Sequence, residues 1–190
     1  MDGYKEMENL TKETMENIVN DWFGRYPELM KYLKAAGFYE YPASVSYHGR
    51  EEGGLFKHSL QVTYELQRLT EKLDLKWQRK ESPVIVGMLH DICKLDDYTI
   101  THVPEMHGMD GYMSMNYNQK KDYPGHGDKS LIMLIGLIDL TKEECMCIRY
   151  HMGAFTDSKE WEYYSRAVQQ YPNVLYTHTA DMIASQIKGV

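Results

Sequence analysis

The sequence predicts an all-α domain with a long loop or small β-hairpin inserted near residues 98–123. Apolar residues recur at steps of three and four over most of the chain, which is typical of helices with one buried face. Helix start and stop signals separate these stretches at short intervals. Between residues 98 and 123 this periodicity gives way to a stretch rich in Gly, Tyr, Thr and Asn.

The composition predicts a single folded domain. The chain has 190 residues, of which 43% are hydrophobic and 26% are charged, so wholesale disorder and a fibrous repeat are both excluded. We expect residues 1–190 to form one domain, with 1–41 as an N-terminal helical extension and 42–188 as the core.

The bounds of the individual helices are predicted from their start and stop signals. The longest is expected from about Leu55 to Leu73, where Leu55, His58, Val62 and Leu66 form one stripe. The other helices are expected at 11–23, 27–37, 82–94, 128–138, 141–152, 161–170 and 172–188. The helix at 128–138 is expected to be buried on all sides, and Thr141 with Glu144 predicts a capping box. A hairpin would pair residues 99–103 with 111–115.

Charge and cysteine content narrow the functional classes. A net charge of −7 disfavours a partner that is a long nucleic acid, which requires a large basic surface. The longest apolar run is too short to span a bilayer, and no signal peptide is expected. Three cysteines, an odd number, fit a reducing compartment, so we expect a cytoplasmic protein without a membrane partner.

Several histidines and acids fall on apolar helical faces. His58 interrupts the stripe of the longest helix, so it points inward and its ring nitrogens need partners. His90 and Asp91 share a helical face with Lys94 and with Gly87, where a second helix could approach closely. Three further residues fit the same interior: His126, His151 and Asp181.

Each of these residues also has an ordinary explanation. A single interior histidine is more often hydrogen-bonded than a ligand. His126 fits a turn, His151 a helix C-terminus, and Asp181 a partner for an arginine. Taken together, however, they leave several buried polar groups in one small domain, and a divalent metal ion would satisfy them at once.

The order of these motifs resembles that of the HD-domain metal-dependent phosphohydrolases. The central motif is residues 88–94, and later motifs lie at 125–130, 150–153 and 178–181. The entry segment 42–60 resembles that of the HD domains of bacterial exoribonucleases and of some relaxase-associated domains. The resemblance covers residues 42–185 and implies an HD-type helical bundle. Nothing in residues 1–41 resembles the nucleic-acid-binding domain of the exoribonucleases, and the chain is acidic, so we expect the ribonuclease activity to transfer less readily.

The resemblance implies a role for each matching residue. His58, His90, Asp91 and Asp181 would form the core metal site, and His126 with His151 would complete a second one. The cofactor would be one or two divalent ions, from among Mn, Fe, Mg, Ni and Zn. Catalysis would rest on Asp91 as a bridging ligand and on Lys94 as a phosphate-binding cation.

The expected substrate is a small phosphorylated anion, a nucleotide or short oligonucleotide, attacked by a metal-activated hydroxide. Its contacts are predicted at Lys94, His48, Arg50, Tyr98 and His178. His48, His178 and Asp128 are equal candidates for the proton donor. The segment 96–123 is expected to cover the site, and Tyr98, Tyr112, Tyr117 and Tyr123 either stack a base or merely anchor the loop.

Two other functions remain open. Some HD-fold proteins use the same six ligands to hold two iron ions and act as oxygenases. A nucleotide-binding module with a degenerate site is the other alternative, although all six ligand positions are filled in this sequence.

Overall fold

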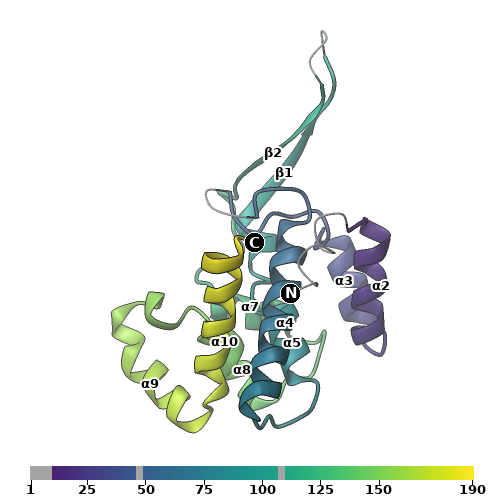
Figure 1. Ribbon diagram of the computed structural model, residues 1–190. Coiled ribbons are helices and arrows are strands. Elements are labelled where there is room, and N and C mark those ends of the chain that lie inside the picture. Colours follow the sequence, from purple (N-terminus) through teal and green to yellow (C-terminus); the bar gives the residue numbers. More distant parts are fainter. Residues whose placement is uncertain (1–9, 46–48, 107–109) are drawn as a thin grey trace.

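The computed structural model describes residues 10–45, 49–106 and 110–190. They form a mostly helical body from which one two-stranded antiparallel hairpin extends (Figure 1). The first half contains α2 (Lys12–Phe23), α3 (Pro27–Ala35), α4 (Gly54–Leu73), α5 (Ser82–Leu89), α6 (Lys94–Asp97), β1 (Tyr98–Val103) and β2 (Tyr112–Tyr117). The second half contains α7 (Gly127–Leu134), α8 (Lys142–Arg149), the short turns η1 (Gly153–Phe155) and η2 (Ser158–Glu160), α9 (Trp161–Gln170), α10 (Asn173–Met182) and the π-helix η3 (Ile183–Lys188).

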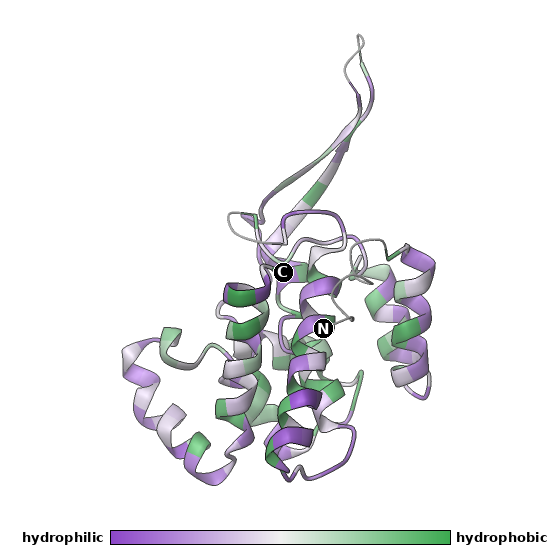
Figure 2. Cartoon of the chain, viewed as in Figure 1, coloured by the Kyte–Doolittle hydropathy of each residue, from purple (hydrophilic) through white to green (hydrophobic). Residues whose placement is uncertain are grey.

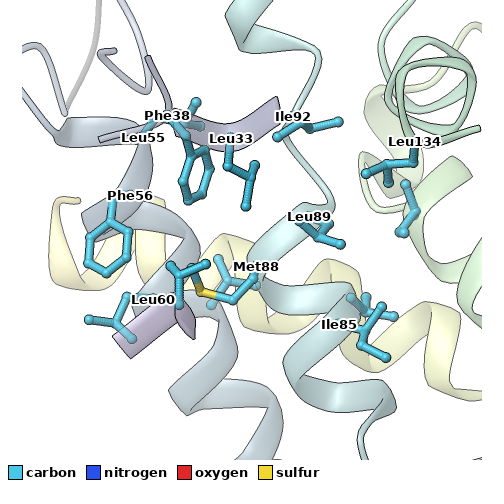
Figure 3. Close-up of a cluster of buried hydrophobic side chains, with 14 of the residues drawn as sticks. Leu33, Phe38, Leu55, Phe56, Leu60, Ile85, Met88, Leu89, Ile92 and Leu134 are labelled. Atoms are coloured by element: carbon cyan, nitrogen blue, oxygen red, sulfur yellow. The ribbon is translucent and has the colours of Figure 1, made fainter. Parts of the chain in front are cut away.

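Helix α4 is the centre of the body, as its long apolar stripe predicts. It packs along α5 on one side and α10 on another, while α10 also packs on α8. The core between these helices is aliphatic and aromatic (Figure 3), and its fully buried members include Leu55, Phe56, Leu60, Met88 and Leu89. The helices carry both hydrophobic and hydrophilic residues (Figure 2), so each can bury one side in this core.

Gly87 allows α4 and α5 to approach closely. A Cβ atom added at this glycine would lie 2.6 Å from Cα and 2.8 Å from N of Thr63 on α4. Such distances are shorter than van der Waals contact, so only glycine fits here. The expected close approach at Gly87 is therefore confirmed, and it brings the following residues, His90 and Asp91, next to α4.

The expected helix over residues 82–94 is wrong in its second half. Helix α5 ends at Leu89, and the chain then continues in tight turns to α6. Main-chain N–H groups of Ile92, Lys94 and Leu95 bond to carbonyls only three residues earlier. His90 and Asp91 are therefore presented by a turn and Lys94 by the start of α6, so their directions do not follow the face of one continuous helix.

The helix expected over residues 128–138 is shorter and less buried than predicted. Helix α7 ends at Leu134, and Gly136 follows in the left-handed region, with φ of 77°. Ile132 and Ile135 are exposed, because the apolar run faces solvent on one side. The capping box predicted at Thr141 and Glu144 is confirmed at the start of α8.

The hairpin is confirmed, but its position differs from the expectation that it covers the site. Strands β1 and β2 pair from Tyr98 opposite Tyr117 to Val103 opposite Tyr112, and the ribbon projects away from the helices (Figure 1). Only its base approaches the body. In the described ranges, no helix is both long and apolar enough to cross a bilayer.

We predict that Gly87→Ala destabilises the fold by about 1–3 kcal/mol, the usual cost of overpacking a core. In an open helix the same change stabilises by about 1 kcal/mol, so the sign of the effect is diagnostic. Urea unfolding monitored by circular dichroism measures it. A variant that is more stable than the parent would contradict the close contact with Thr63.

Candidate metal centre

Four histidines and two aspartates converge in the interior from separate segments of the chain. They are His58 on α4, His90 and Asp91 after α5, His126 before α7, His151 after α8, and Asp181 on α10. These are the six side chains that the sequence singled out. The packing of α10 and α5 against α4 brings their segments together.

Asp91 lies at the centre of the group. Its Oδ1 atom is 2.8 Å from Nε2 of His126 and 3.3 Å from Nε2 of His151. Its Oδ2 atom is 3.7 Å from Nε2 of His58 and 3.8 Å from Nε2 of His90. Asp181 adds a second carboxylate, with Oδ1 3.3 Å from Nε2 of His58. Every imidazole thus presents its Nε2 atom to the carboxylates.

Main-chain oxygens fix these ring orientations. The Nδ1 atoms of His58, His90 and His151 lie 2.9, 2.8 and 2.7 Å from the main-chain oxygens of Val190, Gly87 and Ile148. A main-chain oxygen only accepts, so Nδ1 carries the proton and donates it. In the neutral ring, Nε2 is then left with a lone pair.

His126 is oriented differently, by a thiol. Its Nδ1 atom is 3.4 Å from Sγ of the fully buried Cys93. Burial, the largest influence, raises the pKa of Cys93. A protonated thiol can act as a weak donor or a weak acceptor, so it can satisfy Nδ1 while Nε2 faces Asp91.

When their rings are neutral, His58, His90 and His151 therefore present acceptor atoms to the carboxylate acceptors. The Nε2 atoms of His58 and His90 are only 3.3 Å apart. Oδ1 of Asp91 and Nε2 of His151 are buried without a hydrogen-bond partner. Lone pairs and carboxylate charges at such distances repel one another unless a cation or a proton lies between them.

The ligand geometry suits a metal ion. Three sets of residues each bring their ligand atoms within 4.8 Å of one another. They are His58 with His90 and Asp181, His90 with Asp91 and His151, and Asp91 with Cys93 and His126. Imidazole and carboxylate are ligands for first-row divalent metals, so these groups could hold a metal ion.

Protonation states support the same description. Burial opposes ionisation of Asp91 and Asp181, but nearby positive groups outweigh it. Lys94, His90 and His126 hold the pKa of Asp91 well below its usual range, and His58 lowers the pKa of Asp181 to about 2. Burial lowers the pKa of His90 to about 4. At neutral pH both carboxylates are thus ionised and His90 is neutral, the forms that bind metal.

A pocket of about 420 Å³ opens onto this centre. His58, Asp91, His126 and Asp181 lie on its wall together with three of the predicted substrate contacts, Lys94, Tyr98 and His178. His90 and His151 are fully buried behind it.

Two other predicted residues, the contact Arg50 and the candidate proton donor Asp128, do not line the pocket. Arg50 is exposed, and it is not among the described residues that line the pocket. His48 lies outside the described residues. Asp128, a candidate proton donor, forms an ion pair with Arg149, Oδ1 to Nε 2.6 Å, away from the pocket lining.

The residues of the site that were not predicted include Cys93, Val190 and Phe155. Cys93 stands within the central motif, and its position next to the metal ligands was an available signal. Val190 contributes a backbone oxygen and Phe155 an exposed ring on the pocket wall. Neither role depends on a sequence pattern, so no sequence signal marked them.

Comparison with known proteins adds no assignment. The chain matches no protein-family model, and comparison with curated proteins and with solved structures finds no match. The described residues include a buried cluster that could hold a metal ion and is compatible with an HD-type site.

We predict that Gly189→Val weakens metal binding about 10- to 100-fold, the usual effect of disturbing a hydrogen bond behind a metal ligand. Gly189 has a φ of 78°, which a β-branched residue rarely adopts, and it directs the oxygen of Val190 toward His58. Isothermal titration with Mn²⁺ measures the affinity.

Gly136→Val is the matched control for that variant. Gly136 has a φ of 77°, and an added Cβ would meet nothing within 4 Å at either glycine. Its strain should resemble that at Gly189, while Mn²⁺ affinity should be unchanged. Equal losses in both variants would contradict the orienting role of Val190.

We also predict that the histidines of the metal-free protein titrate in a set order. Burial opposes protonation of His58 and His151, but Asp181 and Asp91 outweigh it and raise the pKa of both rings above the ordinary 6.5. On lowering the pH these rings therefore protonate first, and His90 follows only near pH 4. Nitrogen-15 NMR of the imidazoles measures the order. Protonation of His90 above pH 6 would contradict it.

Proposed function

We propose that this protein is an HD-type metal-dependent phosphohydrolase. Its substrate would be a phosphoester of a nucleotide or short oligonucleotide. One observation carries the proposal: a cluster of six side chains that could hold a metal ion opens onto a pocket that also presents Lys94. That combination suits a small phosphorylated anion better than a neutral substrate.

The six proposed ligands would bind one or two divalent ions. His58, His90, Asp91 and Asp181 would hold the first ion, with His126, His151 and the shared Asp91 available for a second. Mn, Fe, Mg, Ni and Zn are the candidates. Such an ion supplies a hydroxide nucleophile at neutral pH and neutralises charge on the phosphoryl oxygens.

Lys94 is the substrate-binding cation of this proposal. Burial disfavours its charge, but Asp91 outweighs burial and raises the pKa of the ammonium above its ordinary range. Lys94 therefore stays charged at neutral pH while it lines the pocket. It would bind the phosphoryl oxygens and stabilise the charge that gathers on them in the transition state.

His178 is the candidate proton donor that lies on the pocket wall. Its Nδ1 atom donates to the carbonyl oxygen of His151 at 2.8 Å. A proton given to a leaving group would therefore come from Nε2.

A di-iron oxygenase is the second candidate, because the same cluster offers ligands for two ions. Phosphate release from nucleotides under anaerobic conditions with Mn²⁺ supports the hydrolase. Oxygen consumption that depends on substrate, together with an iron EPR signal, supports the oxygenase. A stable protein that binds no metal and turns over nothing would instead indicate a non-catalytic module.

We predict that Asp91→Ala abolishes hydrolysis, since Asp91 contacts four of the proposed ligands. Lys94→Ala should keep its metal content but lose about 10²–10³-fold in turnover, the usual effect of removing one charge-stabilising group. Metal analysis and phosphate release on a nucleotide panel measure both variants. Lys120→Ala, an exposed lysine outside the pocket lining, should change neither quantity. Wild-type turnover in Asp91→Ala at saturating Mn²⁺ would overturn the assignment.

A further inference from the structure

We propose that the pocket mouth binds a planar ring on the substrate, and that the substrate carries a single phosphate rather than an oligonucleotide chain. This inference rests on the proposed phosphohydrolase function and narrows its substrate. It follows from two pairs of rings that belong to the same pocket lining, Tyr98 with Tyr117 and Phe155 with His178.

The first pair stands at the base of the hairpin. Tyr98 and Tyr117 are directly opposite in the strand register, and their ring centroids are 5.6 Å apart. Nζ of Lys94 lies 5.7 Å from the centroid of Tyr98. The proposed phosphate-binding cation and an aromatic surface are therefore adjacent, as a ring-bearing phosphoester requires.

This pair is held in place by a buried ion cluster. Lys129 of α7 is fully buried, with Nζ 2.5 Å from Oδ2 of Asp96 and 2.9 Å from Oδ1 of Asp97. The main-chain N–H of Asn118 donates to the carbonyl oxygen of Asp97 at 2.8 Å. Both strand ends that carry the tyrosines are thus tied to the body, which limits the entropy lost when a ring binds.

The second pair comes from a different segment. Phe155, in η1, leaves 68% of its surface exposed although it lines the pocket. Its ring centroid lies 6.3 Å from that of His178, and His178 is fixed by its bond to the carbonyl oxygen of His151. A substrate ring that binds here would bury the phenyl group of Phe155 away from water. A sugar phosphate or alkyl phosphate without an aromatic ring would gain less binding free energy from this contact.

The charge along the hairpin argues against a longer nucleic acid. From Tyr98 to Gln119 the sequence contains no lysine or arginine, while Glu105 and Asp110 are acidic. A bound oligonucleotide needs cations that follow its phosphates away from the reacting one. The hairpin strands offer none, and Lys121, which follows β2, is paired with Asp97, Nζ to Oδ1 2.9 Å. One ring and one phosphate are therefore the portion of substrate that this site matches.

Titration calorimetry of the Mn²⁺-loaded protein with phenylphosphonate and ethylphosphonate tests the ring site, because hydrolysis does not cleave their C–P bonds. We expect phenylphosphonate to bind about 10-fold more tightly, in line with one aromatic stack. Phe155→Leu and Tyr117→Leu, which keep apolar bulk but remove the ring, should each reduce that preference.

Tyr112→Leu is the matched control. Tyr112 pairs with Val103 five residues along β2 from Tyr117, so its side chain lies on the opposite face of the same ribbon. It is also exposed, and it is not among the described residues that line the pocket. The preference for phenylphosphonate should remain intact in this variant. An equal loss in Tyr112→Leu would overturn the assignment to Tyr117.

The failure of this inference can be told apart from failure of the proposed function. Equal affinity for the two phosphonates, in a protein that hydrolyses phosphoesters, overturns the ring site alone. A protein that binds neither phosphonate and hydrolyses no phosphoester overturns both. A phosphorylated trinucleotide that inhibits p-nitrophenyl phosphate hydrolysis 10-fold better than its mononucleotide would overturn the restriction to a single phosphate.

Discussion

The bond from imidazole Nδ1 to a main-chain oxygen is the interaction on which the candidate site depends. At His58, His90 and His151 this bond fixes both the tautomer and the direction of the ring. All three Nε2 atoms then face Asp91 as acceptors. Without these bonds the rings could rotate to satisfy one another, and a cluster of histidines would be only a polar patch in a helical core.

Residues that pack the core next to the site also place its ligands. Gly87 permits the contact between α5 and α4, and its carbonyl oxygen also orients His90. Leu89 is fully buried at the end of α5, and the turn that follows it presents Asp91. Packing and ligand placement are therefore properties of one short segment, so changes in the core there are expected to alter the site.

Features that are marked by a periodic apolar pattern or by a local sequence motif could be predicted from the sequence. His58 was identified because it interrupts a leucine stripe, and the capping box at Thr141 because local hydrogen bonds define it. The break after Leu89 was missed because the turn continues in α-like dihedrals and keeps the apolar pattern. The direction of the hairpin and the contribution of Val190 depend on tertiary packing, which no local pattern records.

The wide separation of the ligand segments along the chain has a thermodynamic consequence. An unfolded chain does not hold residue 58, residue 90 and residue 181 at one point, so an ion that binds all three binds the native state. Occupancy then adds RT ln(1 + [L]/Kd) to the free energy of unfolding. Under this linkage, the melting temperature of the protein would report the concentration of free metal in its surroundings.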